Sequence, residues 1–126
     1  MMNRSIAIGI LQAHDATIPR TMISFASINT AKPVWWFDIP LAKVQQSLYL
    51  YLHLLCFDDV SNILYHLEIP TAYLRDQESG LAVRTDKACI SLELSTLQAN
   101  RFRDRRPTGR GVEFRQFLKH SFEGES

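Results

Sequence analysis

The stretch from Lys32 to Phe57 constrains the fold more than any other part of the chain. It contains both tryptophans and the densest apolar run of the sequence. Its first part, Val34–Phe37, is β-branched and aromatic, which predicts a strand with two apolar faces. Such a strand has to be covered on both sides, so the remaining segments must supply layers around it.

A helix is expected to follow this strand at Pro40, because proline is favoured in the first turn of a helix. Apolar residues then recur at helical spacing: Leu41, Val44, Leu48, Leu52 and Leu55. The end of the run, Leu48–Phe57, also alternates in the way that a strand does. Leucine is a good helix former and no Val, Ile or Thr interrupts this run, so we favour one long helix over about Pro40–Cys56. The strand stays open as the alternative.

Short strands are expected along much of the remaining chain, bounded by Gly, Pro and polar residues. The segments are Ser5–Gln12, Thr21–Asn29, Thr71–Arg75, Leu81–Thr85 and Ala88–Ser95. The first two are expected to form an antiparallel meander with the tryptophan strand, since short connections favour neighbouring strands. The next two flank a polar turn with Gly80 and predict a hairpin. In Ala88–Ser95, polar and apolar residues alternate, which predicts one solvent-facing side.

Two further helices complete the expected fold. One runs from about Val60 to Glu68, and the other closes the chain over about Gly111–Phe122. The sequence therefore predicts a single α+β domain over residues 1–126. Its architecture is a mainly antiparallel curved sheet packed on the long central helix, with a C-terminal helix.

Composition narrows the function classes. The 126 residues carry a net charge of +1, which argues against a uniformly basic protein that coats nucleic acid. The apolar run is about half of the roughly 20 residues needed to cross a bilayer, so we expect no membrane partner. Cys56 and Cys89 show no metal-binding or redox spacing and are interpreted as buried thiols. Without an export signal, the expected location is the cytoplasm.

An arginine-rich segment near the C-terminus is the most suggestive motif. Its five arginines are Arg101, Arg103, Arg105, Arg106 and Arg110. Arginine recognises phosphate in bidentate fashion, and a glycine-rich entry to a helix binds anions, so phosphate or nucleic-acid binding is the alternative function. The more ordinary interpretation is a solvated basic loop that pairs with the acidic region 58–93.

A small apolar ligand pocket is the other candidate site, with Trp35, Trp36 and His53 as lining residues. The four histidines are scattered along the sequence, without HExxH or paired spacing, so we expect no metal site and no cofactor. No catalytic grouping stands out. The favoured function is a non-catalytic binding or interaction protein; a small enzyme of unknown reaction, with its site near His53, is a further alternative.

A homodimer is expected from the second half of the long helix. Leu50, Leu54 and Phe57 lie on the face that polar residues would occupy in a solvated helix. A short chain has limited surface for hiding such a stripe, and large exposed apolar patches mark partner sites.

Overall fold

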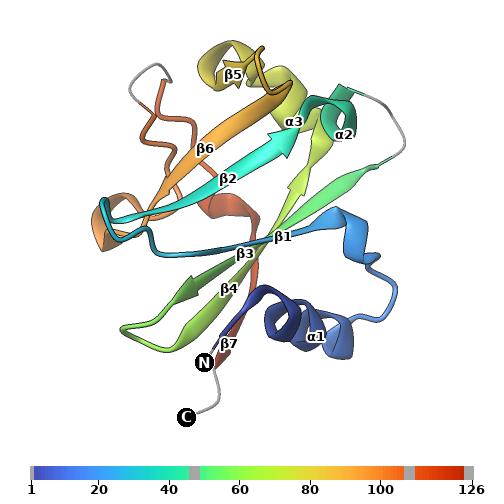
Figure 1. Ribbon diagram of the computed structural model, residues 1–126, viewed down its shortest axis with the longest axis vertical. Helices are drawn as coiled ribbons and strands as arrows, with labels where there is room; N and C mark the ends of the chain where they lie inside the picture. Colours follow the sequence, from blue (N-terminus) through green and yellow to red (C-terminus); the bar gives the residue numbers. More distant parts are fainter. Residues whose placement is uncertain (1, 46–48, 107–109, 124–126) are drawn as a thin grey trace.

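The computed structural model describes residues 2–45, 49–106 and 110–123 (Figure 1). Within these ranges, seven strands form two sheets. Sheet A has the order β1–β3–β4–β7, with β1 at Ile23–Ser27, β3 at Tyr51–Asp58, β4 at Ile63–Pro70 and β7 at Leu118–Glu123. Sheet B has the order β2–β6–β5, with β2 at Val34–Pro40, β6 at Cys89–Ser95 and β5 at Ala82–Arg84. Strand β1 runs parallel to β3, and the other pairs are antiparallel.

Helices are few and short in the described ranges. They are α1 (Arg4–His14), α2 (Leu41–Gln45) and α3 (Thr71–Asp76). Single 3-10 turns occur at Arg20–Met22, Glu78–Gly80, Gln98–Asn100 and Arg115–Phe117. Figure 1 shows α1 in the lower part of the molecule, while α2, α3 and sheet B occupy the upper part.

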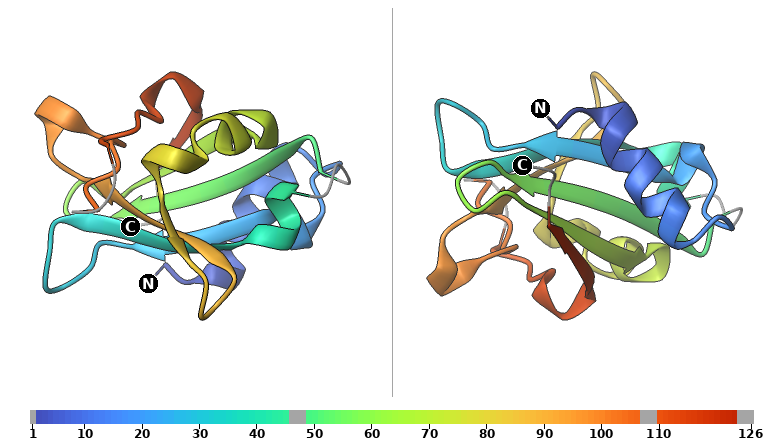
Figure 2. Two further views of the ribbon diagram at one scale, coloured as in Figure 1. Left: turned by 90° about the horizontal axis from the view of Figure 1, so that it is seen from above. Right: turned by 90° about the horizontal axis from the view of Figure 1, so that it is seen from below.

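The molecule is layered, with sheet A in the middle. One face of sheet A packs on sheet B, and this larger core contains Trp35, Phe37 and Leu92 from sheet B. The opposite face packs on α1, where Ala7, Ile8 and Leu11 meet apolar residues of β1, β3 and β4. Strands β3 and β4 accordingly run through the middle of the molecule in both views of Figure 2.

The long helix over Pro40–Cys56 is wrong, and with it the predicted fold class. Only Leu41–Gln45 is helical, residues 46–48 lie outside the described ranges, and Tyr51–Asp58 is the strand β3. The six residues Leu52–Phe57 are all buried, because α1 covers one face of β3 and sheet B covers the other. A strand buried on both faces reads as an unbroken apolar run, which periodicity cannot distinguish from a buried helix. The fold is mostly β, and the strand alternative is the correct one here.

The predicted N-terminal strand is also wrong, since Ser5–Gln12 lies within α1. Asn3 caps this helix, its side-chain oxygen accepting a hydrogen bond from the Ile6 amide at 2.9 Å. The alternating isoleucines were misleading, because α1 buries Ala7, Ile8 and Leu11 and leaves Ile6 exposed. The antiparallel meander fails as well, since β1 and β2 belong to different sheets.

The helix expected at Val60–Glu68 is replaced by β4. Val60 stays 91% exposed, whereas Ile63–Pro70 pairs with β3 along its whole length. The first arm of the expected hairpin, Thr71–Arg75, is instead the helix α3. The second arm is confirmed as β5.

The C-terminal helix over Gly111–Phe122 is wrong too. Val112 and Phe114 enter the larger core, whereas Phe122 packs on the opposite face of sheet A. The helical spacing in the sequence is therefore a coincidence, because these residues belong to two different elements, a loop and the edge strand β7. The predicted strands around Val34–Phe37 and Ala88–Ser95 are confirmed as β2 and β6, but all seven residues of β6 are buried.

Candidate metal centre

The four histidines of the chain, far apart in sequence, meet on the face of sheet A that packs on α1. We call them the histidine cluster: His14 ends α1, His53 lies on β3, His66 on β4 and His120 on β7. His53 Nδ1 lies 2.8 Å from His66 Nε2, and the Nε2 atoms of His14 and His120 are 3.1 Å apart. The rings of His66 and His120 stack with centroids 5.9 Å apart. The four rings therefore form one continuous row.

The β3–β4 register explains why these residues meet. His53 pairs with Glu68, and Leu55 pairs with His66. Paired residues of antiparallel strands point to the same face, and every second residue shares that face. His53, His66 and Glu68 therefore project together toward α1. Each brings one ligand atom, and these three atoms all lie within 4.8 Å of one another.

Burial keeps the inner pair of the cluster neutral. His66 is 1% exposed, and burial lowers its pKa to about 3, with repulsion from His53 and His120 acting in the same direction. Burial also lowers the pKa of His53, although the carboxylate of Glu68 opposes this shift. Neutral imidazole is the form that binds metal ions. Both rings are thus in the ligating form at neutral pH.

The hydrogen bond between the two rings also identifies the favourable tautomer. His66 Nδ1 is buried and has no hydrogen-bond partner among the described residues. A proton on Nδ1 would be a buried, unsatisfied donor, which costs about 1–3 kcal/mol. We therefore assign the proton of His66 to Nε2, from which it is donated to His53 Nδ1. One proton lies between two nitrogens that both belong to potential metal ligands.

A β-bulge in β7 brings a cation to the same site. His66 pairs with His120 and Leu67 with Leu118, so Lys119 is an extra residue without a partner in the ladder. Its ammonium donates to Glu68 Oε2 at 2.5 Å, and this contact raises the pKa of Lys119. Bulges redirect side chains next to functional sites.

An open cavity of about 400 Å³ adjoins two of the three candidate ligands, His53 and Glu68. Lys119, Asp15 and Tyr51 also line it. His66 does not line this cavity and lies deeper in the protein. The candidate site therefore opens to solvent on the side of His53 and Glu68.

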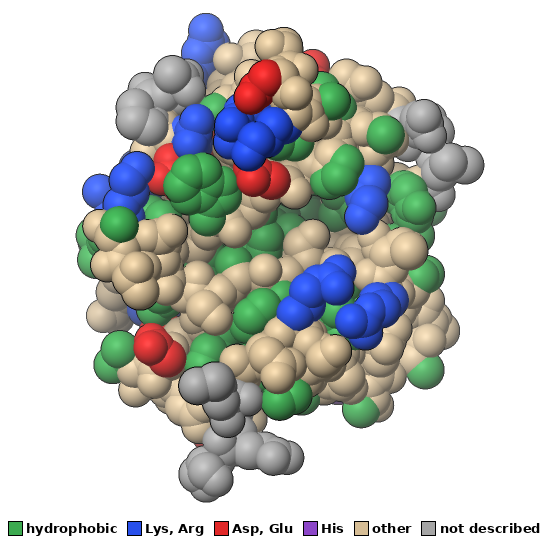
Figure 3. Space-filling view, in the orientation of Figure 1, with side chains coloured by type: hydrophobic (Ala, Val, Ile, Leu, Met, Phe, Trp, Pro, Cys, Tyr) green, Lys and Arg blue, Asp and Glu red, His purple; other side chains and the backbone are tan. Residues whose placement is uncertain are grey.

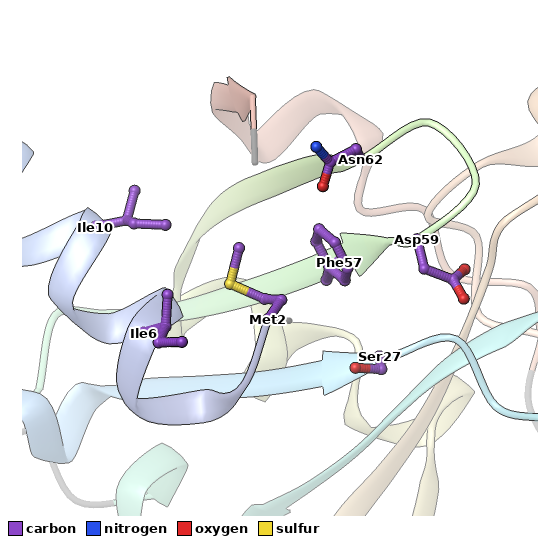
Figure 4. A pocket seen from close by; sticks show the side chains of 7 residues that line it. All are labelled: Met2, Ile6, Ile10, Ser27, Phe57, Asp59 and Asn62. Atoms are coloured by element: carbon purple, nitrogen blue, oxygen red, sulfur yellow. The ribbon is translucent and has the colours of Figure 1, made fainter. Parts of the chain in front are cut away.

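A larger cavity of about 620 Å³ lies at the other end of α1 (Figure 4). Ile6 and Ile10 of α1 and Met2 border it, and Phe57 of β3 borders it from the sheet. Its volume is in the range of small-molecule sites. None of the predicted pocket residues Trp35, Trp36 and His53 lines it.

The predicted pocket residues do not come together. Trp35 is buried in the larger core, where it stacks on Phe102 and donates its indole N–H to the Phe57 carbonyl oxygen at 2.9 Å. Trp36 is 38% exposed on the outer face of sheet B. His53 lines the smaller cavity, on the opposite side of sheet A from Trp35.

Three of the five predicted anion-binding arginines have partners within the chain. Arg101 donates to the Tyr65 hydroxyl at 2.8 Å, and Arg103 contacts the Glu113 carboxylate through two nitrogens at 2.8 and 3.0 Å. The guanidinium of Arg106 lies 3.4 Å from Glu93. The pairing of Arg106 with Glu93 matches the interpretation in which the basic segment pairs with the acidic region.

The other two arginines, Arg105 and Arg110, are exposed. Their backbone amides bond to the carbonyl oxygens of Glu93 and Gly80, which holds the segment against sheet B. Figure 3 shows basic and acidic side chains mixed over the upper part of one face, where sheet B lies. This face therefore lacks the unbroken positive charge that favours a phosphate backbone.

The chain matches no protein-family model, no curated protein and no solved structure. The longest helix in the described ranges, α1, has 11 residues, and no helix there meets the length and hydropathy of a membrane span. The candidate site therefore has to be judged on its own chemistry.

Proposed function

We propose that this protein binds a divalent transition-metal ion through His53, His66 and Glu68. The observation that carries the proposal is the convergence of two buried, neutral imidazoles and one carboxylate within 4.8 Å. Two histidines and a carboxylate form a recurrent ligand set for zinc and for non-haem iron. This gives the expected non-catalytic binding protein a specific ligand.

The distances require only a small adjustment. Zinc–nitrogen bonds of about 2.0–2.1 Å at a tetrahedral angle separate two ligand nitrogens by about 3.3 Å. His53 Nδ1 and His66 Nε2 are 2.8 Å apart, so the two rings have to move apart by about 0.5 Å. The ion then replaces the proton between the nitrogens. That proton moves to Nδ1 of His66, so both rings remain neutral, and metal ligation offsets the cost of about 1–3 kcal/mol of this buried donor.

Equilibrium dialysis with zinc tests the proposal. We expect one ion per chain, and we expect His53→Ala or His66→Ala to weaken binding by at least about a hundredfold, since even indirect partners of a metal contribute 10–100-fold. Glu68→Gln keeps the shape of the side chain and is expected to weaken binding by about tenfold or more. His14→Ala is the matched control, because it removes a histidine of the same cluster from outside the ligand set.

Two outcomes would contradict the proposal. One is a wild-type protein that retains no zinc at micromolar concentration. The other is Glu68→Gln and His66→Ala variants that bind zinc as tightly as His14→Ala while circular dichroism reports an intact fold. The apolar ligand pocket, phosphate binding by the arginine segment and the homodimer all stay predictions.

A further inference from the structure

The cavity beside the histidine cluster suggests what the metal site would bind. We propose that the metal-loaded protein takes a small oxyanion, a carboxylate or a phosphate, which contacts both the metal ion and Lys119. This inference rests on the proposed metal site and adds the chemical class of its ligand.

Access to the metal comes from one side. His53 and Glu68 line the cavity, while His66 approaches the site from the interior. A site with three protein ligands keeps at least one coordination position open for water or a substrate. That position faces the cavity, because two of the three ligands line it. A molecule in the cavity therefore has direct access to the ion.

Charge decides which molecules the cavity favours. Among the described residues, the charged side chains that line it are Asp15, Glu68 and Lys119, which together carry one net negative charge in the metal-free protein. A divalent ion changes this to one net positive charge. Anions are therefore disfavoured in the metal-free protein and favoured in the loaded one. This makes anion binding conditional on the metal.

Lys119 provides a second contact for the anion. An ammonium offers three donors, and one of them bonds to Glu68 Oε2. The bulge leaves Lys119 outside the strand ladder and on the border of the cavity. An oxyanion can accept from this ammonium with one oxygen and bind the metal with another, and hydrogen bonds between charged groups are the strong ones. The volume of about 400 Å³ admits a small molecule.

Cobalt-loaded protein provides the test, because the visible bands of Co²⁺ respond to a change of its ligands. Sodium acetate and inorganic phosphate are titrated separately. We expect at least one of them to shift the bands saturably, and the arm that responds identifies the anion as a carboxylate or a phosphate. Lys119→Met is expected to weaken anion binding by about tenfold or more while cobalt still binds. Lys87→Met, an exposed lysine next to sheet B, is the matched control and is expected to match the wild type.

The outcomes separate the two proposals. If cobalt does not bind, both the metal site and the oxyanion site are rejected. If cobalt binds but neither anion shifts the bands, only the oxyanion site is rejected. The same holds if calorimetry gives equal anion affinity with and without cobalt, or if Lys119→Met and Lys87→Met behave alike.

Discussion

Two buried polar clusters lie on opposite sides of the molecule and hold their ionisable groups in different ways. On the outer face of sheet B, the carboxylate cluster consists of Glu93 and Asp104, which are 1% and 2% exposed. Lys32 lies 2.9 Å from Glu93, and Arg106 lies 3.4 Å from its second oxygen. Asp104 Oδ1 accepts from the backbone amides of Glu93 and Arg106. Glu93 thus has a cation beside each oxygen and Asp104 accepts from two amides, although Glu93 Oε2 and Asp104 Oδ2 form no hydrogen bond among the described residues.

In the histidine cluster, the rings pair with one another and not with groups of opposite charge. His53 and His66 face each other as two neutral bases joined by one hydrogen bond. Buried charges are stabilised by opposite charges, and buried bases avoid charge by staying unprotonated. The comparison indicates that the carboxylate cluster stabilises the segment that covers sheet B. The histidine cluster instead keeps uncharged nitrogens, which is the form that the proposed metal ion requires.

Removing both cations from the carboxylate cluster is expected to have the largest effect. The double variant Lys32→Ala/Arg106→Ala leaves Glu93 buried without a cation, and breaking a buried ion pair costs about 3–5 kcal/mol. Lys32→Ala alone should cost less than about 1 kcal/mol, because this side chain is 55% exposed. Urea denaturation measures both values.

A compensating variant tests the reason for this loss. Adding Glu93→Leu to the double variant removes the unpaired charge, so we expect most of the lost free energy of unfolding to return. If the triple variant is as unstable as the double variant, unpaired charge is not the cause and the contrast between the two clusters fails.

Acid is expected to have the next largest effect, through the histidine cluster. His66 has a pKa of about 3 in the folded protein against an ordinary 6.5, so the unfolded chain binds more protons between these values. The free energy of unfolding therefore falls as the pH drops below 6.5, by about 3 kcal/mol near pH 4.5. Burial raises the pKa of Asp104, so its own contribution to stability increases as the pH falls. Denaturation of metal-free protein over a pH series measures the sum.

Two variants separate these opposite contributions. His53→Leu/His66→Leu should remove the loss of stability in acid, whereas Asp104→Asn should retain it. Equal pH profiles for the wild type and the double-leucine variant would show that the loss has another origin.

The smallest expected effect is that of the double-leucine variant at neutral pH. Replacing both partners of a buried hydrogen bond with apolar groups is nearly neutral, so the metal-free variant should lie within about 1 kcal/mol of the wild type. His66→Leu alone should cost about 1–3 kcal/mol, because it leaves His53 Nδ1 buried without a partner. Zinc should raise the melting temperature of the wild type and leave that of the double variant unchanged. Thermal unfolding with and without zinc measures this, and a zinc response of the double variant would contradict the assignment of the ligands.

The elements that could be predicted from the sequence are those whose pattern has one dominant cause. The aromatic and β-branched residues of β2 and the regular alternation of β6 predict strands, and both form. β3 is covered on both faces, so residues on both faces are apolar. Its sequence pattern therefore does not exclude a helix. Because β3 is predicted as part of a helix, the predicted fold also lacks the sheet face on which the candidate site lies.

The candidate site could be predicted only in part. The sequence predicts His53 as a pocket residue. Its partners Glu68 and His66 become apparent only from the β3–β4 register. Assigning Ile63–Pro70 as a strand that forms a hairpin with β3 would have revealed all three. His120 joins through β7, which carries no clear strand pattern, and His14 joins through the packing of α1. No local signal in the sequence connects these two residues to the others.

The bulge at Lys119 gives sheet A a position where the length of the chain can change without a change of pairing. Without this residue, His120 would still lie opposite His66 and Leu118 opposite Leu67, in a regular ladder. A chain one residue shorter at this point would keep its imidazoles and lose its ammonium. A variant that lacks Lys119 would therefore retain the three proposed metal ligands, and its cavity would lose the proposed second contact for an anion. A single insertion or deletion in an edge strand is thus an evolutionary route to a new ligand preference on an unchanged sheet.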